Sequence, residues 1–127
     1  MGDLSVVEVA DLFERRRGAW LAEDVDGYLA CFTDDIEITV PGRDDPVRGI
    51  EAYGRLVARA FAWARPRTFE FHHLAVAEDL TVLAEWSIST ERREDAGVTA
   101  WRGMSVCALR DDRIAWWREY WDPSQLA

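Results

Sequence analysis

The sequence lacks lysine and asparagine altogether, and its one glutamine is Gln125. All 15 basic residues are therefore arginines. The absence of lysine excludes Schiff-base catalysis, an internal pyridoxal phosphate linkage and a phosphate-binding loop of the Walker type. Because asparagine is also absent, any group that stabilises an oxyanion has to be a Tyr, Trp, Arg, hydroxyl, backbone N–H or protonated acid.

Cysteine and histidine are scarce as well. Cys31 and Cys107 lie far apart in apolar stretches, which indicates free buried thiols and not a disulfide or a metal site. His72 and His73 are adjacent, and adjacent residues on a strand point to opposite faces, so they do not easily share one metal ion. We therefore expect no metal and no cofactor, although a carboxylate-rich Mg²⁺ site stays open.

The charge balance is acidic. A net charge of −9 leaves no basic surplus for phosphates, so the sequence predicts no nucleic-acid partner. The one dense basic patch, the arginines at 15–17, is expected to be mostly solvated on a helix surface. No stretch approaches the roughly 18 consecutive apolar residues of a membrane span, and residues 1–4 lack the order of a signal peptide. These features indicate a cytoplasmic protein with no membrane partner.

Three helices are predicted in a single domain that spans residues 1–127, of which 49% are hydrophobic. The first begins at a capping box formed by Ser5 and Glu8. Asp24 is the expected N-cap of a short second helix. Apolar residues at helical spacing predict a third helix over residues 50–65.

One strand precedes the third helix and four follow it. Ile36, Ile38 and Val40 alternate with polar residues, as in a half-buried strand. After Pro66, which ends the third helix, the predicted strands cover residues 69–77, 81–91, 98–109 and 113–121. The order ααβαββββ predicts an α+β fold with helices packed on one curved antiparallel sheet.

The last predicted strand is aromatic on both faces. Alternation places Ala115, Trp117, Glu119 and Trp121 on one side, and Ile114, Trp116, Arg118 and Tyr120 on the other. One side can pack against the helices. The aromatic groups on the other side also have to be shielded from water. We therefore expect a homodimer through the outer sheet face.

Three passages of the chain resemble the SnoaL-like family, which has the nuclear transport factor 2-like fold. They are residues 24–36 (DVDGYLACFTDDI), residues 41–50, and residues 101–123, in which the sequence WREYWD at 117–122 is the most specific part. The resemblance implies a cone-shaped α+β barrel, in which three helices pack over a strongly bent sheet and leave a pocket at the open end. The family includes polyketide cyclases, limonene epoxide hydrolase, ketosteroid isomerase, dehydratases and non-catalytic binders, so the fold does not settle the function.

Position by position, the chain departs from the epoxide hydrolases. Their catalytic aspartate in the final strand corresponds to Glu119 here. The resemblance places Trp86 and Ile88 where those enzymes have an arginine and a second acid. It places Ile38 and Val40 where the epoxide hydrolases have a tyrosine and an asparagine that hold the water molecule. The residues that activate water are missing, which argues against epoxide hydrolysis.

Glu119 is the strongest catalytic candidate. Tryptophans on its own strand face would desolvate the carboxyl group and suit it to proton transfer near neutral pH. Tyr28 is a candidate donor on the helical side, and the histidine that faces inward, for which we take His73, is a candidate second proton carrier. In the alternative interpretation, Glu119 pairs with an arginine such as Arg102 or Arg113, or lies at the wet rim of the sheet.

The pocket that the resemblance implies is expected to be apolar, with tryptophan-rich walls. Its candidate lining residues are Trp86, Ile88, Trp101, Trp117, Trp121, Val57, Phe61, Ile38 and Val40. The favoured function is cofactor-free isomerisation, cyclisation or hydrolysis of a small hydrophobic molecule by acid–base proton transfer. The alternatives are a module that binds a hydrophobic ligand without catalysis, and a protein-interaction domain that uses the outer sheet face.

Overall fold

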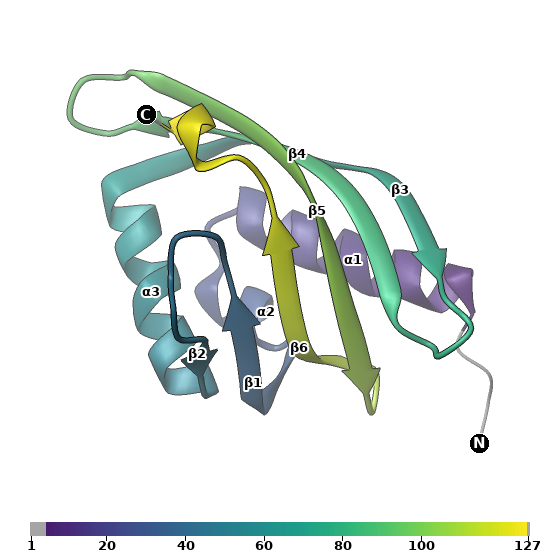
Figure 1. The fold of residues 1–127 in the computed structure, drawn as a ribbon. Coiled ribbons are helices and arrows are strands. Elements are labelled where there is room, and N and C mark those ends of the chain that lie inside the picture. Colours follow the sequence, from purple (N-terminus) through teal and green to yellow (C-terminus); the bar gives the residue numbers. More distant parts are fainter. Residues whose placement is uncertain (1–4, 127) are drawn as a thin grey trace.

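The computed structural model describes residues 5–126, which form three α-helices packed on one curved, six-stranded sheet (Figure 1). The helices are α1 (Val6–Leu21), α2 (Val25–Leu29) and α3 (Ile50–Trp63). The strands are β1 (Phe32–Thr39), β2 (Val47–Arg48), β3 (Ala64–Val76), β4 (Val82–Arg92), β5 (Val98–Arg110) and β6 (Arg113–Tyr120), and a 3₁₀ helix, η1 (Pro123–Leu126), follows. The predicted α+β fold is confirmed.

The strands follow the order β2-β1-β6-β5-β4-β3, and all neighbours are antiparallel except β1 and β6. The chain passes through α3 and the β3–β5 meander between β1 and β6, and parallel strands require such a long crossover. This topology places β6 inside the sheet, facing the helices that cover it (Figure 1).

The predicted starts of the first two helices are confirmed. Ser5 Oγ accepts a hydrogen bond from the backbone N–H of Glu8 at 3.1 Å, and the Glu8 carboxylate accepts one from the N–H of Ser5. The Asp24 carboxylate accepts from the N–H of Gly27 at 3.0 Å. Both caps satisfy backbone donors that have no partner inside the helix.

The strand boundaries differ from the prediction at one edge of the sheet. β3 begins at Ala64, directly after α3, and not at residue 69. Pro66 lies within β3, which is an edge strand, where a residue without an N–H is tolerated. The short elements β2 and η1 were not predicted, because two and four residues show no periodicity.

A β-bulge in β3 overturns the alternation expected for the two histidines. The register of β3 against β4 shifts between Phe71 and His73, and an inserted residue breaks the period of two. His72 Nε2 bonds Ser87 Oγ at 2.8 Å, and His73 Nδ1 bonds Glu85 Oε1 at 2.7 Å. Both histidines are therefore exposed on the outer side of the sheet, and neither faces inward.

A second bulge lies in β6. The register against β5 shifts between Ala108 and Leu109, which leaves Ala115 without a partner on β5. Ile114 and Trp117 are consequently both buried, although they are three residues apart. The expectation that Ile114 shares a face with Trp116, Arg118 and Tyr120 is wrong, because the bulge turns it toward the core.

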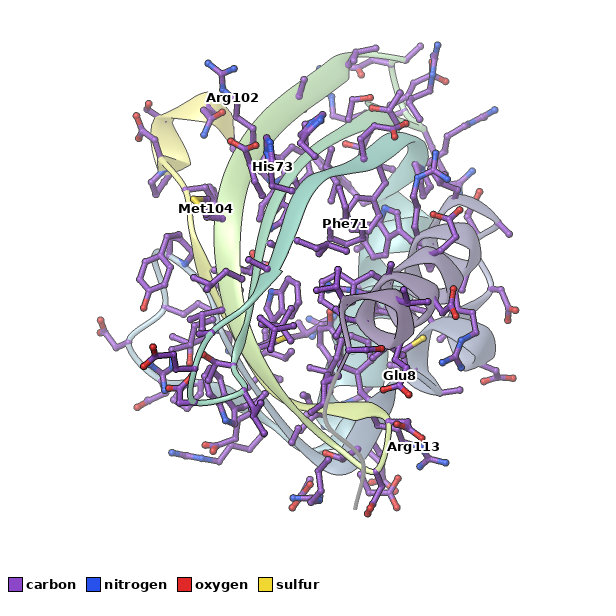
Figure 2. All side chains as sticks on the ribbon, turned by 90° about the vertical axis from the view of Figure 1, so that its right-hand side faces the viewer. Glu8, Phe71, His73, Arg102, Met104 and Arg113 are labelled. Carbon is purple, nitrogen blue, oxygen red and sulfur yellow. The ribbon has the colours of Figure 1, made fainter. Side chains whose placement is uncertain are left out.

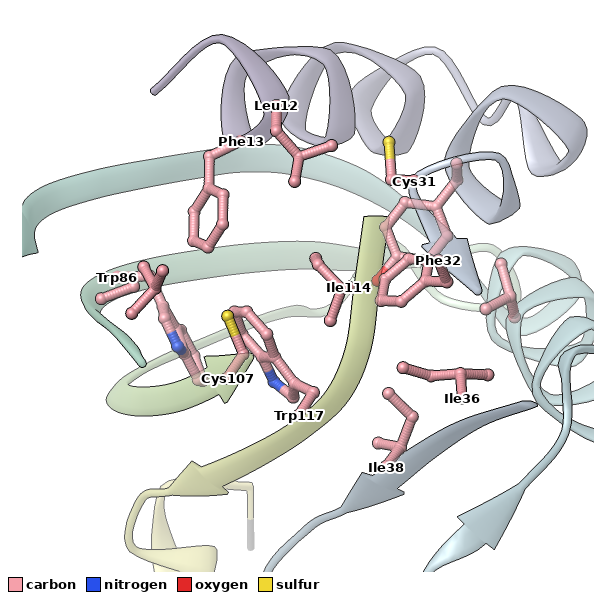
Figure 3. Packing of buried hydrophobic residues seen from close by; sticks show 14 of the residues in the cluster. Leu12, Phe13, Cys31, Phe32, Ile36, Ile38, Trp86, Cys107, Ile114 and Trp117 are labelled. Carbon is pink, nitrogen blue, oxygen red and sulfur yellow. The ribbon is translucent and has the colours of Figure 1, made fainter. Parts of the chain in front are cut away.

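The core lies between the helices and the inner side of the sheet. Phe13 of α1, Trp86 of β4 and Trp117 of β6 are among its largest side chains (Figure 3). The indole N–H of Trp86 donates to Ser105 Oγ at 2.6 Å, so this buried polar group is satisfied within the core.

The two cysteines are free and buried, as predicted. Burial raises the pKa of both thiols, that of Cys107 to about 12. Both side chains therefore pack as small apolar groups and stay in the thiol form at neutral pH.

The outer side of the sheet carries exposed apolar groups. Leu83 is 37% exposed, Met104 46% and Tyr120 61%. Figure 2 shows Phe71 on the helix side of the sheet and Met104 on the opposite side. Self-association through this outer face stays a prediction. Within residues 5–126, no helix is long and apolar enough to cross a membrane.

Substituting Ser105 with Ala is expected to lower the free energy of unfolding by about 1–3 kcal/mol, because the buried Trp86 indole N–H loses its acceptor. Urea unfolding monitored by circular dichroism measures the change. The matched control is Ser87→Ala on the neighbouring strand, which removes a hydroxyl bonded to an exposed histidine and should cost less than about 0.5 kcal/mol. Equal costs for the two variants would contradict this assignment.

Candidate functional site

A pocket of about 120 Å³ lies between the helices and the inner side of the sheet. It is lined by Arg16, Trp20, Tyr28, Tyr53, Phe69, Trp86, Ile88, Trp101, Trp117 and Glu119. Wider hollows lie on the surface of the protein. One of these is lined mainly by exposed charged residues, among them Asp34, Asp35 and Arg110. The combination of aromatic walls with a few convergent polar groups makes the inner pocket the candidate site.

Glu119 is half-buried in the wall of this pocket and is fixed by two indoles. Trp117 Nε1 donates to its Oε1 at 2.9 Å, and Trp121 Nε1 donates to its Oε2 at 2.9 Å. Trp117 and Glu119 alternate along β6 and share its inner face, and Trp121 follows directly after the last residue of the strand. Each carboxylate oxygen keeps a free lone pair, so the group can still accept a proton or a hydrogen bond from a ligand.

Arg16 is the most unexpected member of the site. Its side chain is only 4% exposed, although the sequence predicted a mostly solvated arginine patch. The neighbours fit that prediction better: Arg15 is exposed, and Arg17 forms an ion pair with Glu70 at 3.2 Å. Arg16 differs because it lies on the apolar stripe of α1, which turns it toward the sheet.

Aromatic rings and hydroxyls surround the Arg16 guanidinium. Its Cζ lies 3.9 Å from the centroid of the Trp117 ring, a close cation–π contact. Nη2 donates to the Tyr28 hydroxyl at 3.1 Å, and that hydroxyl shares a hydrogen bond with the Tyr53 hydroxyl at 2.7 Å. Nε and Nη1 are buried and have no hydrogen-bond partner among residues 5–126.

The charge of Arg16 persists despite its burial. Burial alone lowers the pKa of a guanidinium, but Tyr28, Tyr53 and Glu119 outweigh it, and the pKa is raised. Burial, followed by the nearby Tyr28, also raises the pKa of Tyr53 well above its usual value, so this phenol is neutral near pH 7. The pocket therefore contains a fixed cation, a neutral phenol and the carboxyl group of Glu119.

Trp20 adds a further polar group to the same region. Its ring packs against Tyr28 and Phe61, with centroid distances of 5.3 and 4.8 Å. The indole Nε1 is buried and, in the part of the chain that the structure describes, has no acceptor.

Most residues predicted for the site lie near one another. Glu119, Tyr28, Trp86, Ile88, Trp101 and Trp117 line the pocket. Trp121 binds Glu119, and its ring centroid lies 6.4 Å from that of Trp101. Ile38, Val57 and Phe61 are buried in the core, and Val40 is half-buried against it, but none of the four lines the pocket. His73 lies outside, paired with Glu85 on the outer face.

Four lining residues were not predicted: Arg16, Trp20, Tyr53 and Phe69. The periodicity of α1 contains the signal for two of them. Val9, Phe13, Arg16 and Trp20 follow one helical stripe, and an arginine on an apolar stripe points toward the core. Among the described residues, no group of three His, Cys, Asp or Glu side chains is arranged to hold a metal ion.

Comparison with known proteins gives a family and a set of similar structures. The family model of the SnoaL-like domain matches residues 9–117. No curated protein matches the chain significantly. A proposed isomerase from Bacillus subtilis is 19% identical with a TM-score of 0.83, over 93% of this chain and 88% of that one. An LEH-like epoxide hydrolase from M. tuberculosis is 23% identical with a TM-score of 0.78, over 94% of this chain and 86% of that one.

A third similar structure is a proposed polyketide cyclase from Xanthomonas campestris pv. campestris. It is 16% identical with a TM-score of 0.77, over 94% of this chain and 93% of that one. At these identities the three structures share the fold with this chain, and fold alone does not transfer an activity.

Replacing Arg16 with Met is expected to change the free energy of unfolding by less than about 1 kcal/mol. The loss of the cation–π contact and of one hydrogen bond is offset, because a buried charge with unsatisfied donors is also removed. Urea unfolding measures the change, with the core truncation Phe13→Ala, which should cost about 3–5 kcal/mol, as the reference. A loss of about 3 kcal/mol or more would mean that the protein itself already supplies hydrogen-bond partners for the whole Arg16 guanidinium.

The raised pKa of Tyr53 predicts a loss of stability at alkaline pH. The phenol ionises near pH 10 in the unfolded chain and at higher pH in the folded one, so its stabilising effect is complete below about pH 10 and falls above it. Tyr53→Phe should reduce this alkaline loss, as measured by unfolding between about pH 9 and 11. Tyr120→Phe, at an exposed tyrosine, is the control and should leave the pH profile unchanged.

Proposed function

The chain belongs to the SnoaL-like domain family, and from this premise we propose that it catalyses a cofactor-free proton transfer on a small, largely apolar molecule, with Glu119 as the proton carrier. The observation that carries the proposal is the position of the Glu119 carboxylate, fixed by two indole N–H groups at the wall of an aromatic pocket. A general base needs such a fixed orientation toward the proton that it removes.

The size of the pocket supports a small substrate. An engineered protein cavity of about 150 Å³ admits benzene. A pocket of about 120 Å³ therefore accepts a body of about six non-hydrogen atoms, and fused polycyclic molecules would require it to widen. The aromatic walls, among them Trp86 and Trp101, exclude water and hold such a body against Glu119.

The other polar groups come from the helical side of the pocket. Tyr28 lines the pocket beside Arg16 and is the candidate proton donor to the substrate. Arg16 supplies the positive charge that balances Glu119 while a proton is transferred. We assign no role to His73, because its side chain is exposed and bound to Glu85 on the outer face.

Epoxide hydrolysis is not favoured. The walls of the pocket include Trp86 and Ile88 at the positions where the resemblance implies an arginine and a second acid. These side chains cannot orient or deprotonate a water molecule. A module that binds a small ligand without catalysis is the second candidate, because the same pocket would serve both functions.

Glu119→Gln is expected to abolish catalysed proton exchange at carbon. The assay incubates the protein in D₂O with a panel of small ketones and unsaturated carboxylates of about six non-hydrogen atoms, and proton NMR follows the replacement of C–H by C–D. We expect the wild type to accelerate exchange in at least one compound, and the variant to lose about 100-fold or more of this rate, the usual contribution of a general base.

The matched control is Glu85→Gln, which neutralises a carboxylate on the outer face and should keep the wild-type rate. Circular dichroism of both variants checks that they are folded. An undiminished rate in Glu119→Gln would contradict the proposal, and the absence of exchange in the wild type with every compound would favour the binding module.

A further inference from the structure

Three hydrogen-bond donors at the pocket have no acceptor within residues 5–126: Nε and Nη1 of Arg16, and Nε1 of Trp20. The two residues are one helical turn apart on α1, and both line the pocket. A buried donor without a partner costs about 1–3 kcal/mol, and a charged one costs more. A folded protein that retains three such groups at one place indicates a ligand that supplies the acceptors.

The charge of Arg16 is also not neutralised by contact. Its direct neighbours are the hydroxyl of Tyr28 and the faces of aromatic rings. Glu119 is the one acidic residue that lines the pocket as described, but its two oxygens are bound to indoles, and it forms no ion pair with Arg16. A water molecule could accept from the free donors, but it would not balance the charge.

We propose that the pocket binds a small monocarboxylate whose oxygens accept hydrogen bonds from Arg16 and Trp20. A carboxylate carries one negative charge and offers about four lone pairs, which matches one cation and the four N–H groups on the three free nitrogens. Phosphate fits less well, since it carries more charge and requires more donors. The small, apolar remainder of the pocket favours a short hydrocarbon body.

The arrangement also fixes the orientation of this ligand. Glu119 repels a second carboxylate, so the charged end turns toward Arg16. The body then lies against Phe69, Trp86 and Ile88, which line the same pocket as Glu119. The inference names the substrate class for the proposed function and rests on that function only for the catalytic step, since binding requires Arg16 and Trp20 alone.

The experiment compares isobutyrate with isobutyramide, which has the same shape and no charge. ¹H–¹⁵N NMR of the full chain follows the Arg16 Nε–H and Trp20 indole N–H signals, the latter assigned through Trp20→Phe. We expect isobutyrate to shift both signals and to bind at least about tenfold more tightly than the amide, the factor typical of a charge-assisted hydrogen bond. Equal affinities, or shifts confined to other signals, would overturn the inference.

Variants separate the carboxylate subsite from the fold and from catalysis. Arg16→Met should remove the preference for isobutyrate, and Arg15→Met, which makes the same charge change at an exposed neighbour, should keep it. Glu119→Gln should bind isobutyrate as tightly as the wild type or more tightly, even when it has lost proton exchange. Loss of the preference in Arg15→Met as well as in Arg16→Met would show a general charge effect and would contradict the subsite.

Discussion

The buried guanidinium of Arg16 lies where the helical layer and the sheet meet at the pocket. It lies over the Trp117 ring of β6 and donates to Tyr28 of α2, which bonds Tyr53 of α3. One cation thus connects all three helices with the strand that carries Glu119. A buried arginine is costly to desolvate, and the aromatic faces and phenol oxygens around it offset only part of that cost.

The polar groups of the pocket come from both layers of the fold. Arg16 belongs to α1, and Glu119 belongs to the end of β6. The Trp117 indole contacts both groups, since its ring faces Arg16 and its N–H binds Glu119, while the apolar walls come from β3, β4 and β5. Such a pocket is polarised before any ligand enters, which is the condition for electrostatic preorganisation.

Periodicity and capping predicted the helices, the meander and the inner placement of Glu119, because these follow from local rules that the chain obeys. The same rules gave the wrong face for His73 and Ile114, because a β-bulge inserts one extra residue into one strand of a pair. Arg16 was missed for a different reason. Its charge suggested solvent, whereas its place on the stripe of Val9 and Phe13 determines its direction.

The bulge at Ala115 could be removed without moving the site. Ala115 is the extra residue between two paired positions, because Ile114 pairs with Leu109 and Trp116 pairs with Ala108. Deleting it would leave these pairs in place and give a regular strand, in which Ile114, Trp117 and Glu119 still face inward. The bulge bends and twists the strand locally, whereas the inner position of Glu119 is set by its pairing with Ser105 of β5.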